Sequence, residues 1–121
     1  MIKIYATENS RAMRPIWTAE EMGLDYQLNM MPFPPRVFMK EYLDVNILGT
    51  VPYLIDGNIE MTESVAISQY LVEKYGPTDL QVKSNEKDYP YYLNWLFHSD
   101  ATLTFPQTVV LRYKLQEPGV A

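Results

Sequence analysis

Short stretches of alternating apolar and polar residues open the chain. Ile2–Ala6 alternates in this way and predicts a first strand. The segment 7–10 is polar and rich in capping side chains, and the apolar residues of 11–22 then recur at helical spacing as far as Gly23, which predicts a helix. Alternation returns over 26–30 and predicts a second strand. A strand, a helix and a strand joined by short loops form a right-handed crossover, so we expect the first two strands to be parallel.

The middle of the chain predicts a short helix followed by a hairpin. After a stiff, exposed, proline-rich loop at 32–35, residues 37–45 have room for a short helix. The β-branched and aromatic run 51–55 is strand-like. The Asp-Gly-Asn sequence at 56–58 is a strong turn signal, and 59–62 returns as the partner strand.

Two further helices complete the predicted elements. Residues 62–64 offer a capping hydroxyl and an acidic group at a helix start, and Gly-Pro at 76–77 ends that helix. The segment 78–84 is polar without periodicity and is typical of a linker. A long helix then begins near residue 85, and Pro106 should kink it.

The composition narrows the functional classes. The 121 residues amount to one domain or slightly more, and a hydrophobic content of 47% is ample for a packed core. A net charge of −5 without a basic cluster makes nucleic acid and anionic membranes poor partners. With no cysteine and one histidine, the chain offers no disulfide, no thiolate metal site and no multi-histidine metal site. It has neither an apolar signal core nor a run of membrane length, so we expect a soluble cytoplasmic protein.

The segment 51–64 carries the most informative combination of residues. X-Pro is the one kind of peptide bond with an appreciable cis population, and a cis Val51–Pro52 bond would turn the Val51 amide and carbonyl outward to pair with an extended peptide. Ser64 and the N–H groups of the helix start suit a carboxylate, and Glu63 suits an ammonium, so the pair could grip the head of an α-amino acid. Alternatively, Glu63 complements the helix dipole and Ser64 caps the helix.

The stretch VPYLIDGNIEMTESVAISQYLVEKYGP resembles the glutathione-binding half of the glutathione S-transferase family, in which a V-P strand, a D-G hairpin and an E-S helix start recur together. The resemblance covers residues 1 to about 117. It implies an α/β fold with a thioredoxin-like βαβ-ββα domain over 1–77, a linker over 78–84 and the first helix of an all-α domain over 85–121. Family members carry several more helices after this point, so we expect a truncated chain.

The resemblance implies that glutathione is the co-substrate and that its sulfur is held as a thiolate. A free thiol has a pKa of about 8.5, so a hydroxyl or amide donor just past the first strand would favour the ionised form. The segment T-E-N-S-R-A-M-R is similar to the S-x-x-S segment of serine-using classes and to the T-P-N-G segment of nu-class members. It implies Thr7 as the first candidate donor, then Asn9 and Ser10, with Tyr5 fourth. Alternatively, Thr7 or Ser10 caps the following helix.

The segment N-I-L-G-T-V-P departs from the N-P-x-G-K-V-P pattern of many relatives, in which the lysine reaches the glycyl carboxylate of glutathione. Thr50 takes the place of that lysine, and Lys40 and Arg36 are either replacements or ordinary solvated charges. We therefore expect weak affinity, since a hydrogen bond to a charged group contributes about 1.5–3 kcal/mol. The implied glutathione site is completed by Val51, Pro52, Glu63 and Ser64.

The helix after the linker resembles the first all-α helix of the family, which helps to form the electrophile pocket and a two-fold dimer. Tyr91, Trp95 and His98 are the candidate pocket residues, or alternatively core and dimer contacts. The resemblance implies a homodimeric glutathione transferase that conjugates glutathione to an apolar electrophile, as in detoxification. Two alternatives stay open: glutathione-dependent reduction of a disulfide or peroxide, as in nu-like members, and a non-catalytic interaction protein with this fold.

Overall fold

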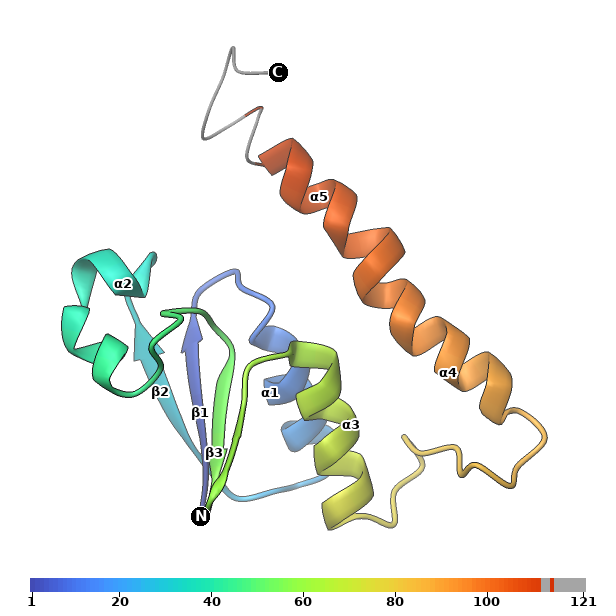
Figure 1. Ribbon diagram of the computed structural model, residues 1–121. Coiled ribbons are helices and arrows are strands. Elements are labelled where there is room, and N and C mark those ends of the chain that lie inside the picture. The colour runs from blue at the N-terminus through green and yellow to red at the C-terminus, as the bar shows by residue number, and fades with distance from the viewer. Residues whose placement is uncertain (112–113, 115–121) are drawn as a thin grey trace. The chain divides into compact units, whose positions relative to one another are not determined.

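The computed structural model describes residues 1–111 and 114, which form two compact units, Met1–Gln81 and a second that begins at Val82. Strands and helices alternate through the first unit, and the second is helical (Figure 1). In chain order the elements are β1 (Ile2–Thr7), α1 (Met13–Glu21), β2 (Tyr26–Met31), α2 (Pro35–Phe38), the 3-10 helix η1 (Lys40–Asp44), β3 (Tyr53–Asp56), β4 (Ile59–Met61), α3 (Ser64–Tyr75), α4 (Tyr89–His98), the π-helix η2 (Ser99–Thr104) and α5 (Phe105–Val110).

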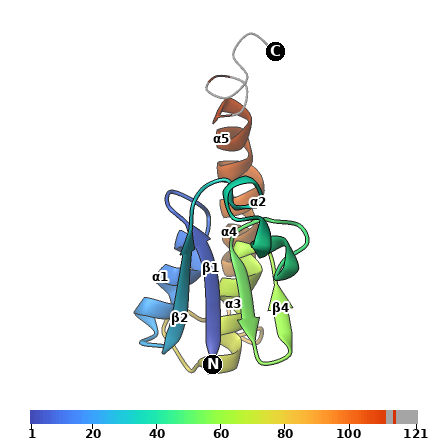
Figure 2. The same cartoon turned by 90° about the vertical axis from the view of Figure 1, so that its left-hand side faces the viewer.

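The four strands form one mixed sheet in the order β2-β1-β3-β4, seen face-on in Figure 2. β1 and β2 are parallel, as the crossover predicted, and Ile2 pairs with Tyr26. β3 is antiparallel to both β1 and β4, and the hairpin turns at Gly57, whose φ of 62° is the left-handed conformation that glycine tolerates. A βαβ unit followed by a ββα unit is the thioredoxin-like arrangement, so the predicted fold class is confirmed.

Helices cover both faces of this sheet. α1 and α3 lie on one side and α2 on the other (Figure 1). On the α1 and α3 side, alternate strand residues and helix residues form the main core, which consists of Ile2, Ile4, Ala19, Leu54, Ile67 and Leu71. A smaller cluster of Met31, Tyr42 and Tyr53 lies on the opposite side, where Tyr42 comes from η1. Alternate residues of the strands therefore enter two hydrophobic cores, one on each face of the sheet.

The prediction of one continuous helix over 37–45 is wrong. Two short helices, α2 and η1, occupy the region, and α2 begins earlier, at the buried Pro35. Met39 separates them because its backbone leaves the helical region, at φ −144° and ψ 70°. Its side chain packs against the cluster around Tyr42, so tertiary packing overrides the local helical preference at this position.

The long helix predicted after the linker is helical from Tyr89 to Val110 but is not α-helical throughout. Residues Ser99–Thr104 form a π-helix immediately before α5, where we expected Pro106 to kink an α-helix. Proline has no N–H, and its ring crowds the carbonyl four residues earlier, which belongs here to the π-helical turn. Within the described residues, 1–111 and 114, no helix has the combination of length and apolarity that a bilayer crossing needs.

A buried carboxylate stabilises the end of the sheet where β1 begins. Asp56, which pairs with Ile2, is 6% exposed. Its Oδ2 accepts hydrogen bonds from Tyr70 Oη at 2.8 Å, Lys74 Nζ at 2.8 Å and Tyr75 Oη at 2.6 Å. Burial alone would raise the pKa of Asp56, but the hydrogen bonds from α3 outweigh it and lower the pKa from 3.8 to about 2.

We predict that Asp56→Asn lowers the free energy of unfolding by about 1–2 kcal/mol at neutral pH, because the ionised carboxylate accepts three hydrogen bonds in the folded state. A folded-state pKa below the ordinary value gives stability that is present above pH 3.8 and lost as the pH falls through about 2. Urea unfolding at a series of pH values should therefore show the variant and the wild type converging in acid. Asp79→Asn, at an exposed linker carboxylate, is the matched control and should change stability by less than about 0.5 kcal/mol.

Candidate functional site

Three connections of the first unit meet at the carboxyl end of β1. Thr7 is the last residue of that strand and pairs with Met31 of β2. The antiparallel ladder with β3 ends at Tyr5 and Tyr53, two residues before Thr7 on one strand and two residues after Val51 on the other. The loop after β1 and the start of α3 are at the same end (Figure 1). The fold therefore brings the predicted residues near 7, 51 and 64 to one edge of the sheet.

The loop after β1 is tied together by Ser10. Its Oγ donates to the Thr7 carbonyl at 2.8 Å and accepts the Ala12 N–H at 3.3 Å. Asn9 takes the left-handed conformation at φ 54°, which asparagine tolerates better than most residues. Because the hydrogen of the Ser10 hydroxyl is used within the loop, Ser10 is a poorer candidate donor to a ligand than its hydroxyl alone suggests.

Thr7 differs from Ser10 in this respect. Its side chain is 4% exposed, and its Oγ1 has no hydrogen-bond partner within the described residues. A buried hydroxyl without a partner costs about 1–3 kcal/mol, and native proteins hold few of them. A functional use for the hydroxyl would account for its retention.

The turn before β3 is held by side chains of η1 and its following loop. The Val51–Pro52 peptide bond is cis, the isomer on which the peptide-pairing hypothesis depends. The Thr50 carbonyl accepts Tyr42 Oη at 2.7 Å and Asn46 Nδ2 at 3.0 Å. Burial raises the pKa of Tyr42, which keeps its hydroxyl protonated as a donor. Tyr42 and Asn46 thereby position Val51, and the sequence analysis did not identify either residue.

The start of α3 corrects one prediction. Glu63 is the N-cap residue, with an exposed side chain, and no side chain caps the helix, so the predicted hydroxyl cap at 62–64 is wrong. The Ser64 hydroxyl instead accepts a hydrogen bond from Arg14 Nη1 of α1 at 3.1 Å, and Ser64 is 5% exposed. The local sequence predicts that Ser64 caps α3, but the packing of α1 against α3 uses its hydroxyl for a contact between the two helices.

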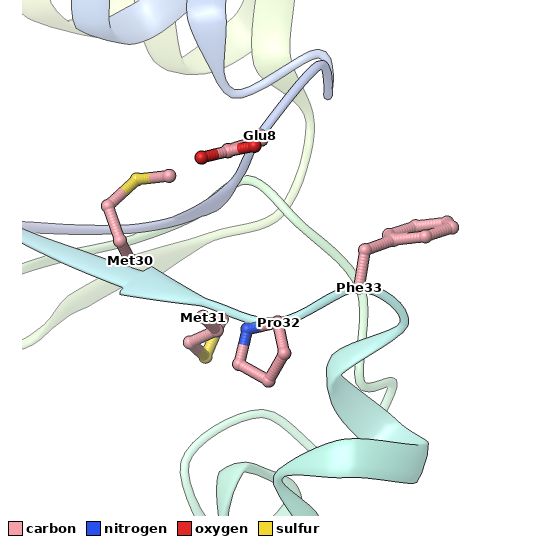
Figure 3. Close-up of a pocket in the computed structure, with 5 residues that line it drawn as sticks. All are labelled: Glu8, Met30, Met31, Pro32 and Phe33. Carbon is pink, nitrogen blue, oxygen red and sulfur yellow. The ribbon is translucent and has the colours of Figure 1, made fainter.

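A pocket of about 300 Å³ lies between Glu8, in the loop that follows β1, and the end of β2 with the loop after it. Figure 3 shows Glu8 and Met30 extending toward each other, while the ring of Phe33 points away from them. Met31 and Pro32 complete the lining. The parallel pairing of β1 and β2 brings these loops to one edge. The sequence analysis predicted that pairing but not the pocket.

The remaining candidates lie elsewhere in the two units. Lys40 is the exposed first residue of η1, whereas Arg36 of α2 lies against the loop at Gly49. In the second unit, α4 carries Tyr91, Trp95 and His98, and the rings of Trp95 and His98 meet edge to face at 4.8 Å between centroids. Tyr91 and Trp95 are exposed. Arg36 is therefore the candidate cation that the fold brings to the Gly49 loop.

The sheet order, the two helical layers and the proline turn define a thioredoxin-like domain. The sequence profile of the family described as glutathione S-transferase, N-terminal domain, matches residues 4–79. The chain belongs to the glutathione S-transferase family.

Individual relatives are similar over most of this chain. Glutathione S-transferase 3 of Schizosaccharomyces pombe is 29% identical over 103 residues, which cover 85% of this chain and 43% of the relative. The solved structure of the apo form of a variant human glutathione S-transferase T1-1 has a TM-score of 0.80 and 25% identity, covering 98% of this chain and 50% of that one. A Sulfitobacter glutathione transferase homolog with bound glutathione shares the fold, with a TM-score of 0.78 and 21% identity, and the match covers 93% of this chain and 54% of that one. The chain thus spans about half the length of the relatives it matches.

We predict that Gly49→Ala destabilises the protein more than Gly57→Ala. Both glycines have φ 62°, so both substitutions cost about 1–2 kcal/mol for a left-handed residue with a Cβ. At Gly49 the added Cβ would also lie 2.9 Å from Arg36 Cβ and 3.0 Å from Leu43 Cδ2, whereas nothing lies within 4 Å at Gly57. Urea unfolding measures the difference, and equal losses would show that the Gly49 loop is loosely packed.

Proposed function

We propose that the protein binds glutathione at the carboxyl end of β1 and stabilises its thiolate for transfer to an electrophilic carbon. The observation that carries the proposal is the buried hydroxyl of Thr7, which has no hydrogen-bond partner within the described residues. Membership of the glutathione S-transferase family and the glutathione-bound Sulfitobacter homolog of the same fold support glutathione as the ligand.

In the proposed complex, the backbone of Val51 pairs with the cysteinyl part of glutathione. The γ-glutamyl head lies at the start of α3, where Ser64 and the helix N–H groups bind its carboxylate and Glu63 binds its ammonium. Thr50 lacks the charge for the glycyl carboxylate, so we assign that role to Arg36, whose Cβ lies against the Gly49 loop. This arrangement uses three connections that converge at the end of β1.

For the attack of the sulfur on the electrophile, this chain has to provide only one hydrogen bond to the sulfur. Thr7 donates its hydroxyl hydrogen to the sulfur, the thiol proton leaves to water, and the sulfur lone pair attacks the electrophilic carbon. A carbon–sulfur bond forms as the bond to the leaving group breaks. Thr7 Oγ1 is enclosed in the structure, so the groups that cover it must move when the sulfur arrives. The chain has no cysteine, so the thiolate has to come from the ligand.

The experiment that tests the proposal is calorimetric titration with glutathione, followed by assays of chlorodinitrobenzene conjugation and disulfide reduction. Binding together with conjugation supports transferase activity. Binding with disulfide reduction alone would favour the reductase chemistry. The absence of binding at millimolar glutathione would favour a non-catalytic interaction protein.

We predict that Thr7→Val leaves the free energy of unfolding unchanged or higher, because the methyl group replaces a hydroxyl that has no partner in the part of the chain that the structure describes. The same variant should raise the pKa of bound glutathione by about one to two units and lower turnover at neutral pH by about 10–100-fold. The pH dependence of thiolate absorbance and of conjugation measures both effects.

Two controls accompany this comparison. Thr7→Ser retains the donor and should keep most of the turnover. Ser10→Ala removes the Ser10 hydrogen bond to the Thr7 carbonyl, so it should lower stability more than it lowers turnover. Equal losses of turnover for Thr7→Val and Ser10→Ala would refute the assignment of Thr7.

We further propose that the pocket of Glu8 and Met30–Phe33 receives the electrophile, because its lining includes Glu8, the residue after Thr7, and four apolar residues. Tyr91, Trp95 and His98 of α4 remain the proposed contribution of the second unit. The Glu8 carboxylate should disfavour anionic electrophiles.

We predict that Glu8→Gln raises kcat/KM for an anionic chloronitrobenzoate by about 3–10-fold relative to neutral chlorodinitrobenzene, since one nearby like charge costs on the order of 1 kcal/mol. Added salt should reduce the difference. Glu73→Gln changes the net charge equally on α3 and serves as the control. An unchanged substrate ratio in Glu8→Gln would place the electrophile elsewhere.

For the whole protein, we propose a homodimer with a detoxification role in the cytoplasm, where reduced glutathione forms the main thiol pool. Exposed aromatic side chains of the second unit support association, because large exposed apolar surfaces mark interaction sites. They include Tyr91, Trp95, Phe97 and Phe105. Light scattering measures the oligomeric state.

A further inference from the structure

The outer edge of β2 is an open sheet edge without the usual protection. β2 is the terminal strand of the order β2-β1-β3-β4, and within the described residues no strand pairs with its other side (Figure 2). Its six residues, YQLNMM, include neither a charged residue nor a proline, the residues by which proteins commonly protect an edge. The outward N–H and C=O groups of this strand are therefore available to pair with another chain.

The opposite edge of the same sheet is protected. β4 has only three residues, Ile59–Met61, and the middle one is Glu60, whose carboxylate accepts Tyr53 Oη at 2.6 Å. A short strand and a charged side chain both hinder pairing with a further strand. β2 is twice as long and uncharged, so the two edges differ in their capacity to accept another strand.

The side chains of β2 give its edge an apolar strip on one face. Because side chains alternate along a strand, Tyr26, Leu28 and Met30 share one face of the sheet, and we call these three residues the β2 strip. Leu28 is 42% exposed and Met30 is 51% exposed, whereas Tyr26 packs against the main core. A chain added along this edge can cover Leu28 with an apolar side chain of its own.

Carboxylates lie at the amino end of the β2 strip. Glu20 of α1 accepts Tyr26 Oη at 2.6 Å, and the exposed Asp25 directly precedes β2. Lys3 of β1 pairs with Gln27 and so lies on the other face of the sheet. The charges therefore favour a chain with a basic residue at this end. A second copy of this chain, with its net charge of −5, is a poorer electrostatic match.

We propose that the outer edge of β2 binds an extended, basic segment of a partner protein as an additional antiparallel strand. The segment has the pattern apolar-x-basic, in which the apolar side chain lies beside Leu28 and the basic side chain lies beside Tyr26 and Glu20. Main-chain hydrogen bonds supply the affinity, and the alternate side chains supply the specificity. None of the residues proposed to bind glutathione belongs to β2.

Nuclear magnetic resonance tests the proposal with the wild-type chain and a synthetic peptide, acetyl-TTVTKT-amide. In the antiparallel register the valine lies beside Leu28 and the lysine beside Tyr26. Titration should shift the amide signals of β2 and slow the exchange of its outward N–H groups with solvent. Glutamate in place of the peptide lysine should weaken binding about tenfold at low salt and less at high salt, because attraction to Glu20 and Asp25 becomes repulsion.

N-methylation of alternate peptide residues tests the main-chain pairing. In an antiparallel pair, consecutive residues direct their N–H groups alternately toward the partner strand and away from it. One peptide is methylated at the odd positions and one at the even positions. One of the two should lose affinity by about tenfold or more, and the other should stay within about threefold of the parent peptide. Equal losses would indicate contact through side chains alone and would overturn strand addition.

Two protein variants locate the binding edge. Leu28→Lys removes an exposed apolar side chain and places a charge on β2, so it should weaken peptide binding by about tenfold or more. Ile59→Lys makes the same change on β4, at a residue that is 44% exposed, and should alter the affinity by less than about twofold. Equal losses in the two variants, or unshifted β2 signals at millimolar peptide, would overturn the proposal.

Two further outcomes are also decisive. Self-association that Leu28→Lys abolishes, without peptide binding, would overturn the proposal in favour of a second copy of the chain at this edge. Should Leu28→Lys not fold, the two N-methylated peptides decide, because that comparison needs only the wild-type protein.

Discussion

The pairing of β1 with strands on both of its edges is the constraint on which the site depends. β2 runs parallel along one edge and β3 antiparallel along the other, and the register places Met31 and the approach to Val51 on either side of Thr7. A shift of one residue in a strand moves its side chains to the opposite face, so this register also decides which side chains enter each core. The position of the Thr7 hydroxyl therefore follows from the packing of Ile2, Ile4 and Leu54 as much as from its own surroundings.

The three connections around Thr7 are held in different ways. Ser10 closes the first loop by bonding to the backbone on either side of it. Tyr42 and Asn46 hold the carbonyl before the proline turn. Arg14 joins the third connection to the first, because it follows the β1 loop and contacts Ser64 at the start of α3. The side chains of Ser10, Asn46 and Ser64 are hydrogen-bonded within the protein, whereas the buried Thr7 hydroxyl has no partner among residues 1–111 and 114.

Local patterns were sufficient for most of the fold. Alternation predicted β1 and β2, the Asp-Gly turn predicted the hairpin, and short connections predicted the parallel pairing. The break at Met39 and the use of Ser64 could not be predicted, because each results from packing between segments distant in the chain. Arg14 left one weak signal, since Arg14 and Thr18, which hydrogen-bond to Ser64 and Ser68, match the four-residue spacing of the two serines. That spacing becomes meaningful only when α1 and α3 are known to pack side by side.

The two ends of β1 have different roles: one contributes to stability and the other is the proposed glutathione-binding site. The carboxylate held by α3 lies at the amino end, opposite Ile2, and the proposed chemistry lies at Thr7, about 17 Å away for a strand of this length. The buried Asp56 carboxylate and its ion pair with Lys74 thus lie where no part of glutathione is proposed to bind. Loops at the carboxyl end can change sequence, and hence ligand preference, without dismantling that anchor. Because the two are separate, the same fold can accommodate different ligands while the stabilisation that Asp56 provides is unchanged.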